Sequence, residues 1–509
     1  RYTGGPMTVG DLLPRLSGVA PTPEAPVTAP AVRDQLVTAI AHDSRDVARG
    51  TIFVAVRGQR FDGARFASDA ATRGAVLVVA ASMRPDDARV PWLRVPDARV
   101  ALAELAAAFY GDPSGDLTVV GVTGTNGKTT TTYLLSAIFD AAGWPCGRIG
   151  SVGYHTGRRE KVAERTTPEA PAIQALLREM VDNRRTTCAI EVSSHALAMR
   201  RVDQIQFAAA VFSNLTRDHL DFHPDMQDYF ATKRRLFDMR RPGAPAVLNL
   251  DDPYGVDLAG TVDHSMTYAI DSAADVTPEH LEMTLSGSVM DVCTPRGRLR
   301  IRSGLPGRLN VYNILAAVAA AVALDVPFPA IERGVAGLDG VPGRFEVVST
   351  RDDDVIVIVD FAHTDDALRA VLTAVRALSP HRVISVFGCG GDRDAAKRPL
   401  MGAVADRLSD LVVVTSDNPR SEDPDAIIAE IRLGMESPAD ADQLRHRGIA
   451  DRAAAIEYAV RQAEPGDAVV IAGKGHESHQ LIGDERRPFD DRRVAHEALG
   501  RRRADIGWA

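Results

Sequence analysis

The chain has few of the residues that mark specialised classes of protein. Its 509 residues include only four cysteines, and these lie far apart and match no metal-binding spacing: Cys146, Cys188, Cys293 and Cys389. They indicate reduced thiols in a cytoplasmic protein. Aromatic residues make up 5% of the chain, hydrophobic residues 45% and charged residues 25%. This balance is typical of globular proteins and excludes disordered and fibrous classes.

The chain also lacks an excess of positive charge and a long apolar run. Its net charge of −9 argues against general binding to nucleic acids or membrane surfaces, so an anionic ligand needs a local cationic pocket. The most apolar stretch, 311–326, contains Asn313 and Asp325 and is too short to span a bilayer. We find no charged start followed by an apolar block, and therefore expect neither a targeting segment nor membrane insertion.

The length and the turn clusters predict about three domains. The first covers 1–110 and contains a proline-rich loop at 20–26, predicted strands at 52–56 and 75–80, and a helix at 101–110. A turn cluster at 111–115 opens the second domain, 111–340. Another at 338–344 precedes the third, 341–509.

Short apolar runs alternate with helical patterns in the second and third domains, which predicts an α/β fold with mostly parallel sheets covered on both faces. The predicted strands are 118–122, 188–192, 208–214, 246–250, 355–360, 382–387, 411–416 and 468–472, with helices at 130–142 and 168–182. Ligands bind beyond the carboxyl ends of such strands, so the loops there are expected to carry function. We expect the tail from Arg501 onward to be solvated and frayed.

A glycine-rich loop follows the first strand of the second domain. Residues 121–132 read Gly-Val-Thr-Gly-Thr-Asn-Gly-Lys-Thr-Thr-Thr-Thr, with Val122 where the strict Walker pattern has glycine. Backbone N–H groups of such a loop surround phosphate oxygens, a lysine reaches the terminal phosphates, and a hydroxyl can ligate Mg²⁺. We therefore expect ATP to bind at Gly124, Thr125, Asn126, Gly127, Lys128, Thr129 and Thr130. A glycine turn without a ligand is the alternative.

Charged and imidazole side chains follow the next two predicted strands of this domain. Glu191 is interpreted as a Mg²⁺ ligand, because a hard cation prefers carboxylate and hydroxyl oxygens shared with phosphates; a surface carboxylate is the alternative. His219, Asp221 and His223 could form a transition-metal site, although they lack the helix-borne pattern with a catalytic glutamate.

Six motifs in this order resemble the Mur ligases of peptidoglycan precursor synthesis over nearly the whole chain: 124–130, 191–197, 214–221, 229–233, 310–313 and 360–364. The segment Asp43-Ser44-Arg45 is similar to the branch of the family that adds diaminopimelate. The resemblance implies an N-terminal domain for uridine diphosphate, a P-loop central ATPase domain and a Rossmann-like C-terminal domain that brings the amino acid.

The resemblance also implies a reaction. ATP phosphorylates the D-glutamyl side-chain carboxylate of UDP-N-acetylmuramoyl-L-alanyl-D-glutamate, and the amine of diaminopimelate then attacks this acyl phosphate to give an amide. Phosphoryl transfer between anions needs charge neutralisation and in-line positioning more than a protein nucleophile. We expect a monomer that binds no nucleic acid, with domain closure to bring ATP and amino acid together.

The resemblance assigns catalysis to Lys128, Glu191, His219 and Lys233, and Mg²⁺ binding to Thr129, Thr130, Glu191, His219 and Lys233. From local sequence alone, Lys233 in Lys-Arg-Arg is a solvated helix-face residue. In the family this lysine is carbamylated, which requires a neutral amine, and nearby cations lower the pKa of a lysine. Further nucleotide contacts are implied for Asn313, Arg344 and Asp360.

Two more ligand sets follow from the resemblance. The UDP-substrate is assigned to Ser44, Thr166, Thr167, Ser193 and Arg201, although Arg165 and Met199 replace the common Asn and Gln. A helix cap is the alternative for the two threonines. Diaminopimelate is assigned to Arg393, Asp417, Asn418, Pro419, Arg420, Gly473 and Glu477. Arg420 offers a planar fork for the distal carboxylate, which lysine lacks.

Four other interpretations stay open at this point. A relative that adds lysine, a folylpolyglutamate synthase and an ATP-binding regulatory protein without catalysis would share the phosphate loop. A dinucleotide fingerprint at 388–391 has its third glycine misplaced. The Ser44 segment and the run 417–420 favour the diaminopimelate-adding ligase, for either the meso or the LL isomer.

Overall fold

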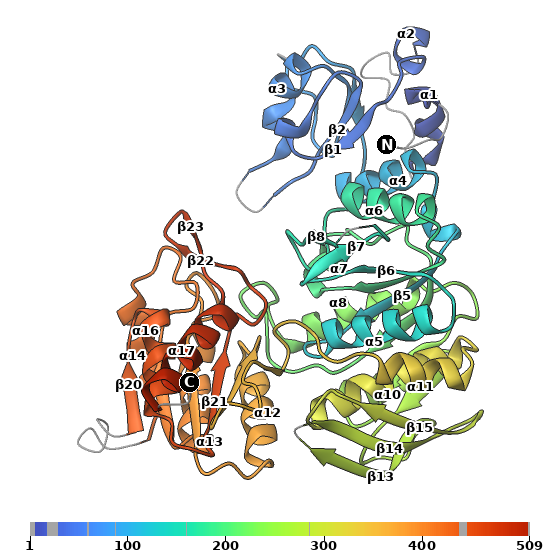
Figure 1. Cartoon of the computed structure of the whole chain (residues 1–509). Helices are drawn as coiled ribbons and strands as arrows, with labels where there is room; N and C mark the ends of the chain where they lie inside the picture. Colours follow the sequence, from blue (N-terminus) through green and yellow to red (C-terminus); the bar gives the residue numbers. More distant parts are fainter. Residues whose placement is uncertain are drawn as a thin grey trace.

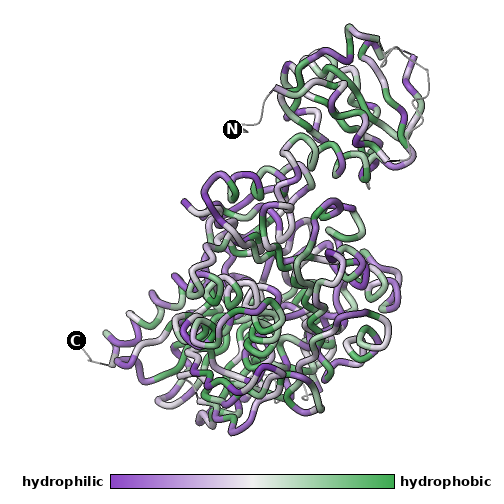
Figure 2. Tube along the Cα trace, turned by 90° about the vertical axis from the view of Figure 1, so that its right-hand side faces the viewer, coloured by the Kyte–Doolittle hydropathy of each residue, from purple (hydrophilic) through white to green (hydrophobic). Residues whose placement is uncertain are grey.

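Three sheet-centred units make up the computed structural model, which describes residues 6–17, 29–58, 61–86, 88–158, 160–284, 286–436 and 445–506. The N-terminal unit lies at the top of Figure 1, the middle unit beneath it and the C-terminal unit beside the middle one. Figure 2 shows the N-terminal unit projecting from the rest of the molecule. No helix of the described ranges is long and apolar enough to cross a membrane. The loop predicted at 20–26 lies outside the described residues.

The N-terminal unit is a parallel sheet in the order β1-β2-β3-β4. Its elements are α1 (Val9–Leu12), η1 (Leu13–Arg15), α2 (Pro30–Arg33), β1 (Ala39–Ala41), η2 (Ser44–Asp46), β2 (Thr51–Ala55), η3 (Gly63–Phe66), α3 (Ala67–Thr72), β3 (Ala75–Ala80), β4 (Trp92–Arg94) and α4 (Ala98–Phe109). The predicted helix begins three residues early, at Ala98, because the Asp97 side chain accepts hydrogen bonds from Arg99 N and Val100 N and caps it.

The middle unit is built on a sheet in the order β12-β11-β10-β5-β9-β6-β7-β8, parallel from β12 to β6. Its strands are β5 (Thr118–Thr123), β6 (Cys146–Ile149), β7 (Gly153–His155), β8 (Glu160–Val162), β9 (Thr187–Glu191), β10 (Phe207–Phe212), β11 (Ala246–Asn249) and β12 (Ser265–Tyr268), preceded by η4 (Pro113–Gly115). The four predicted strands are confirmed to within two residues at either end. Buried clusters on both faces confirm a covered, mostly parallel sheet.

Two groups of helices cover this sheet (Figure 1). On one face lie α5 (Lys128–Ala141), α10 (Arg308–Ala323) and α11 (Phe328–Ala336), and on the other α6 (Ala170–Asp182), α7 (Ser194–Ala198), α8 (Met226–Asp238) and α9 (Pro253–Ala259). The predicted helix at 130–142 starts at Lys128 instead, directly after the glycine loop.

Sequence reasoning missed a small antiparallel sheet in the middle unit. It contains β13 (Thr277–Thr284), β14 (Gly287–Thr294) and β15 (Gly297–Ser303). Met290, Val292, Leu299 and Ile301 of this sheet belong to the buried cluster around α10. Helix α10 therefore lies between two sheets, which explains why the stretch at 311–326 is apolar on all sides.

The C-terminal unit is a sheet in the order β16-β17-β21-β18-β19-β20, in which only β16 is antiparallel. Its strands are β16 (Glu346–Val347), β17 (Ile356–Asp360), β18 (Val383–Phe387), β19 (Leu411–Val414), β20 (His446–Gly448) and β21 (Ala468–Ala472), with a hairpin of β22 (His479–Ile482) and β23 (Glu485–Pro488). One face is covered by α12 (Asp365–Arg376), α13 (Lys397–Leu408) and α14 (Pro424–Arg432), and the other by α16 (Arg452–Gln462) and α17 (Asp491–Ile506).

The prediction that the chain frays from Arg501 onward is wrong. Helix α17 continues to Ile506, and the Arg502 guanidinium donates to both carboxylate oxygens of Asp354 at 2.8 and 2.7 Å. Buried residues at 494, 495, 498 and 499 attach the helix to the sheet. This spacing marks one helical face, but the run of arginines obscured it in the sequence.

We expect Leu499→Ala to destabilise the C-terminal unit by about 2–5 kcal/mol, because Leu499 is buried against the sheet. Amide hydrogen exchange at β17 and β21 measures this change. Arg501→Ala is the control: its exposed ion pair with Glu457 contributes less than about 1 kcal/mol. Equal exchange rates in the wild type and Leu499→Ala would show that α17 does not stabilise the sheet.

Candidate functional site

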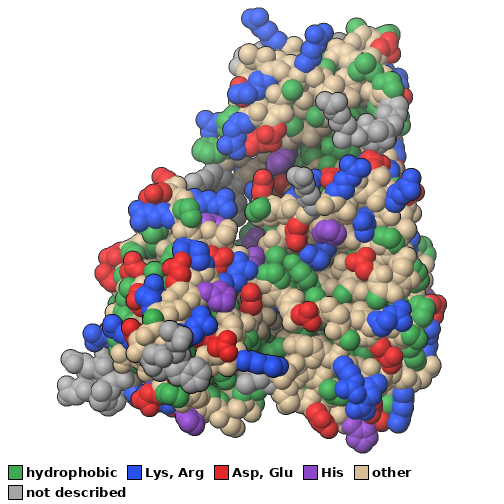
Figure 3. Space-filling model, viewed as in Figure 1, with side chains coloured by type: hydrophobic (Ala, Val, Ile, Leu, Met, Phe, Trp, Pro, Cys, Tyr) green, Lys and Arg blue, Asp and Glu red, His purple; other side chains and the backbone are tan. Residues whose placement is uncertain are grey.

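A cavity of about 720 Å³ lies between the middle and C-terminal units. Figure 3 shows the surface hollowed where these units meet. The walls of the cavity are loops that follow parallel strands of both sheets, as expected for α/β folds, together with residues of α10 and α12. Predicted site residues that line it are Thr125, Asn126, Gly127, Lys128, Thr129, Thr130, Thr166, Glu191, Ser193, His219, Asn313, Arg344, Asp360, Arg393, Asp417, Asn418, Arg420, Gly473 and Glu477. Ser44, Gly124, Thr167, Arg201, Lys233 and Pro419 do not line it.

The glycine loop between β5 and α5 requires glycine at two positions. Gly124 and Gly127 have φ angles of +144° and +88°, in the region that side chains disfavour. A Cβ atom on Gly124 would lie 1.9 Å from the Ser213 hydroxyl, and one on Gly127 would lie 2.3 Å from the Asn313 amide oxygen. The loop therefore packs against β10 and α10 too closely for any other residue.

Asn214, which follows β10, holds the loop in shape. Its backbone oxygen accepts a hydrogen bond from Thr125 N at 2.8 Å, and its side-chain oxygen accepts one from Asn126 N at 2.9 Å. The loop conformation is thus set by a neighbouring strand and does not depend on its own residues alone.

Two lysines meet at this loop, Lys128 in the cavity wall and Lys233 buried behind it. The Lys128 ammonium donates to the carbonyl oxygens of Gly124 and Thr125 at 2.9 and 2.8 Å, and burial lowers its pKa. The Lys233 ammonium, from α8, donates to the same Gly124 oxygen at 2.8 Å and lies over the Tyr229 ring. Burial, together with the charge of Lys128, lowers the pKa of Lys233 well below its ordinary value. The solvated helix face inferred from local sequence is therefore wrong.

Oxygen atoms converge beside this loop. The Thr129 hydroxyl donates to Glu191 Oε2 at 3.1 Å and lies 3.2 Å from the Ser151 hydroxyl. Ser151 N and Oγ donate to Glu191 Oε1 at 2.8 and 3.0 Å. Glu191 is buried, so the surface-carboxylate alternative is wrong. A carboxylate beside two hydroxyls is a donor set that suits Mg²⁺.

Ser151 was missed by sequence reasoning. It follows β6, a four-residue strand that contains a glycine and an arginine and carries little apolar signal. The dipeptide Gly-Ser at 150–151 was the available clue, since small polar residues after a strand are typical of a binding loop.

The transition-metal alternative is not supported. Within the described ranges, no three His, Cys, Asp or Glu side chains are arranged to hold a metal ion. His223 is buried and its Nδ1 donates to Asp228 at 2.7 Å. His219 contacts Asp218 through its backbone N–H at 2.8 Å and through its imidazole Nε2 at 3.4 Å, and burial lowers the pKa of this imidazole to about 3.

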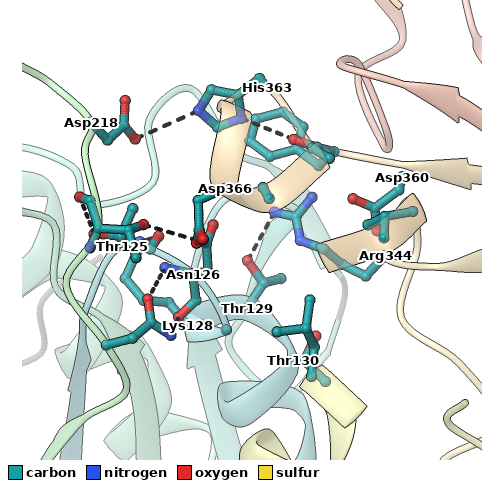
Figure 4. A pocket seen from close by; sticks show the side chains of 18 of the residues that line it. Thr125, Asn126, Lys128, Thr129, Thr130, Asp218, Arg344, Asp360, His363 and Asp366 are labelled. Carbon is teal, nitrogen blue, oxygen red and sulfur yellow. Dashed lines mark hydrogen bonds and ion pairs between the residues drawn. The ribbon is translucent and has the colours of Figure 1, made fainter. Parts of the chain in front are cut away.

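The middle and C-terminal units meet across the cavity through polar contacts. Figure 4 shows Arg344 and His363 directed at Thr129 and Asp218. Arg344, which precedes β16, donates to the Thr129 hydroxyl at 3.0 Å, and His363 Nε2 lies 3.7 Å from Asp218. Burial alone would raise the pKa of Asp218, but the hydrogen bond from His363 and nearby cationic side chains hold that pKa well below its ordinary value.

Asp366 and His476 add two further contacts between the units. Asn126 Nδ2 of the glycine loop donates to Asp366 at 3.3 Å, and His476 Nε2 donates to the Ser151 carbonyl at 2.9 Å. Sequence reasoning assigned no role to Asp366 or His476. Asp366 follows the recognised segment 360–364 by two residues and His476 lies within the segment 473–477, so proximity was the only available signal.

Asp360 and Asn313 are also held by hydrogen bonds. Asp360, at the end of β17, accepts a hydrogen bond from Phe345 N at 2.6 Å, and burial raises its pKa. Asn313 of α10 donates to the Asn310 side chain at 3.1 Å. The three predicted nucleotide contacts outside the loop, Asn313, Arg344 and Asp360, thus line the same cavity as the loop.

The predicted UDP-substrate residues extend from the cavity toward the N-terminal unit. Thr167 donates to the Glu191 carbonyl at 2.8 Å and accepts from Ser193 N at 3.2 Å, while Arg201 donates to the Thr167 carbonyl at 3.1 Å. Ser44 lies in η2 of the N-terminal unit. These bonds bring Thr167, Ser193 and Arg201 together and leave Ser44 apart from them.

The helix-cap alternative for Thr166 and Thr167 is wrong. Helix α6 begins at Ala170, and its N-cap residue is Glu169. The Glu169 carboxylate instead accepts hydrogen bonds from Arg201 at 2.8 Å and from Arg165 at 3.2 Å. The two threonines therefore lie before the helix.

The predicted diaminopimelate residues lie in the loops that follow β18, β19 and β21. Arg420 donates to the Gly391 carbonyl at 2.6 Å, and Asn418 Nδ2 donates to Glu477 at 3.0 Å. Arg393 is half-exposed, with Nη1 4.0 Å from Asp221 of the middle unit. The glycines at 388–391 allow close packing: a Cβ atom on Gly391 would lie 1.9 Å from the Pro419 carbonyl oxygen.

Known protein families and individual relatives match the sequence of all three units. Three family models match the chain: "Mur ligase family, catalytic domain" at 36–110, "Mur ligase middle domain" at 122–321 and "Mur ligase, glutamate ligase domain" at 343–475. A UDP-N-acetylmuramoyl-L-alanyl-D-glutamate–2,6-diaminopimelate ligase of Gloeobacter violaceus is 47% identical and covers 92% of this chain and 95% of its own. One of the same name from Solibacter usitatus is 44% identical and covers 97% and 98%.

Solved structures show the same similarity. A structure of a ligase with that name matches at 33% identity with a TM-score of 0.64, covering 92% of this chain and 96% of its own. MurF from Acinetobacter baumannii matches in fold with a TM-score of 0.66 at 19% identity, covering 98% of each chain.

We expect Gly127→Ala to weaken ATP binding at least about tenfold, because the new Cβ atom would collide with Asn313 and distort the loop. Calorimetric titration with ATP measures the affinity. Gly143→Ala is a matched control: Gly143 also has a positive φ angle, but open space surrounds its Cβ position. Unchanged affinity in Gly127→Ala would contradict the assignment of this loop to phosphate.

Proposed function

The chain belongs to the Mur ligase family, and we propose that it adds 2,6-diaminopimelate to UDP-N-acetylmuramoyl-L-alanyl-D-glutamate in an ATP-dependent reaction. One observation carries this proposal: the phosphate loop of the middle unit and the loops at 417–420 and 473–477 of the C-terminal unit line one cavity. Relatives named for this reaction cover nearly the whole chain. The divisions 1–110, 111–340 and 341–509 then correspond to UDP-substrate, ATP and amino acid.

The reaction proceeds by two displacements. An oxygen of the D-glutamyl side-chain carboxylate attacks the γ-phosphorus of ATP and ADP leaves. The amine of diaminopimelate then attacks the acyl carbon, phosphate leaves, and the nitrogen loses a proton to give the amide. The first step brings two anions together, so the loop N–H groups, Lys128 and Arg344 act by neutralising charge at the transferring phosphoryl group.

The oxygen cluster at the loop supports Mg²⁺ binding. Thr129 and Glu191 provide a hydroxyl and a carboxylate within 3.1 Å of each other, and Thr130, His219 and Lys233 complete the proposed set. Bound there, Mg²⁺ would withdraw charge from the phosphate oxygens. The protein fixes this geometry through Ser151, which holds the Glu191 carboxylate with two hydrogen bonds.

Lys233 is proposed to carry a carbamate. Its amine is buried next to a second ammonium, which favours the neutral form that reacts with CO₂. The nitrogen bonds to the carbon of CO₂ and releases a proton to water, which leaves an anion attached to α8 beside the glycine loop. Carbamylation would also relieve the contact between two cations at the Gly124 carbonyl and add an oxygen donor for the metal.

The amino acid is proposed to lie against Arg393, Asp417, Asn418, Pro419, Arg420, Gly473 and Glu477. The guanidinium groups of Arg393 and Arg420 suit the distal carboxylate, while Asp417 and Glu477 suit the distal ammonium. Lysine has no distal carboxylate. This pairing of charges supports diaminopimelate over lysine, and we propose the meso isomer as the substrate.

The UDP-substrate is proposed to extend from Ser44 past Thr166, Thr167, Ser193 and Arg201, so that its D-glutamyl end reaches the phosphate loop. This path follows the hydrogen-bonded group beside Glu191. We place the reaction in the cytoplasm, where ATP is available, and expect the enzyme to act as a monomer.

We expect the enzyme to release phosphate and form amide with ATP, Mg²⁺ and UDP-N-acetylmuramoyl-L-alanyl-D-glutamate when meso-diaminopimelate is present. Parallel reactions contain LL-diaminopimelate or L-lysine, and mass spectrometry identifies the product. Arg420→Lys removes the planar fork and should raise KM for diaminopimelate about tenfold or more. Turnover with lysine alone would retain the ligase and overturn the amino-acid pocket, whereas turnover with none would favour a regulatory protein.

We expect Lys233→Ala to lower kcat at least about tenfold, because the proposed carbamate organises the metal site. Removing bicarbonate should lower wild-type activity and leave Lys233→Ala unaffected. Intact-protein mass spectrometry and ¹³C-bicarbonate NMR detect the adduct directly. Lys161→Ala, on exposed strand β8, is the control and should keep the bicarbonate response. A fully active Lys233→Ala enzyme that ignores bicarbonate would exclude the carbamate.

A further inference from the structure

Lysine is rare in this chain and is concentrated at the cavity. Lysine and arginine together number 59, but only five of these residues are lysine: Lys128, Lys161, Lys233, Lys397 and Lys474. Lys128 and Lys397 line the cavity, and Lys233 contacts its glycine loop. Arginine provides nearly every other cation. Three of these lysines, Lys161, Lys397 and Lys474, have no role in the proposed reaction. Lys474 is the one that contacts proposed diaminopimelate residues.

Lys474 is completely buried behind the proposed amino-acid pocket. Its ammonium donates to Asn418 Oδ1 at 3.0 Å and to Glu477 Oε2 at 2.8 Å. It also lies 3.7 Å from Asp417 Oδ1. Asn418 Nδ2 donates to the same Glu477 oxygen at 3.0 Å, which closes a triangle of hydrogen bonds. Lys474 thus contacts three of the seven proposed diaminopimelate residues.

The local backbone directs this side chain inward. Lys474 follows β21 and lies between two glycines, Gly473 and Gly475, whose φ angles are +120° and +53°. A Cβ atom on Gly473 would lie 2.9 Å from Asp417 Oδ2, and one on Gly475 would lie 2.7 Å from the Gly343 carbonyl oxygen. The turn therefore fits only with glycine on both sides of the lysine.

We propose that Lys474 is a positioning residue that makes the pocket selective for an amino acid with a second ammonium group. It holds Glu477 through Oε2, which leaves Oε1 for the substrate. The Lys474 ammonium and Leu481 N both donate to Asn418 Oδ1, the latter at 2.9 Å. The Asn418 amide N–H group is therefore directed at Glu477. This inference rests on the proposed function, because it concerns the same amino-acid pocket.

The arrangement of charges supports this role. Asp417 and Glu477 bring two carboxylates to one side of the pocket, and their mutual repulsion is offset by the buried ammonium. Arg393 and Arg420 line the same cavity. The pocket therefore carries side chains of both charges, and it complements a zwitterionic group.

The test compares Lys474→Met with the wild type in the ligase assay. Loss of a charged hydrogen-bond donor should raise KM for diaminopimelate about ten- to hundredfold, with KM for ATP and for the UDP-substrate unchanged. Lys474→Arg should restore binding only in part, because a planar fork cannot direct three donors around one nitrogen. Lys161→Met, which removes an exposed lysine paired with Glu179, should change none of these constants.

A double-mutant cycle separates positioning from simple structural loss. If Lys474 acts through Glu477, adding Lys474→Met to Glu477→Gln should raise KM little further. Multiplicative effects, or equal rises in all three KM values with a lower melting temperature, would overturn the proposal. If the wild type accepts a different amino acid, the proposed function fails, and the same cycle is measured with that substrate. If the wild type turns over no amino acid and calorimetry detects no binding of diaminopimelate to it, both the proposed function and the role of Lys474 are overturned.

Discussion

The Gly124 carbonyl oxygen accepts hydrogen bonds from two ammonium groups, one buried and one at the cavity wall, and the site is organised around this point. Lys128 belongs to the glycine loop, whereas Lys233 comes from α8. Placing two cations at one acceptor is costly, so the local environment must favour a neutral amine. The close packing of Gly124 against Ser213 keeps that carbonyl in place. Phosphate binding, the proposed carbamate and the oxygen cluster beside Thr129 all depend on this geometry.

The proposed reaction requires residues from both the middle unit and the C-terminal unit. The contacts that join them are polar and local: Arg344 with Thr129, and His476 with Ser151. Interfaces of this kind open and close more readily than apolar ones, which suits an enzyme that admits several substrates and then brings them together. The pairing of Ser151 with Glu191 links the interface to the proposed metal site.

Much of the architecture was readable because strong local signals agree with the tertiary structure. Buried parallel strands are short apolar runs, and the strands at 75–80 and 468–472 have the bounds predicted for them. The sheet β13–β15 was missed because its strands are half-exposed and weakly apolar. Helix α17 was missed because its buried face is narrow and its ends are rich in arginine. Lys474 was missed because a lysine between two glycines has the sequence of an exposed turn.

The sequence by itself determined the glycine loop, most of the parallel strands, and the resemblance to a ligase family, because each is contained in contiguous residues or in their spacing. Only the tertiary structure decided the environments of Lys233, Glu191 and Lys474. Their partners lie far away in the chain: Lys233 meets Gly124, Glu191 meets Thr129, and Lys474 meets Asn418. The order of strands in two sheets brings these pairs together, and burial there changes the chemistry of groups that would be ordinary in water.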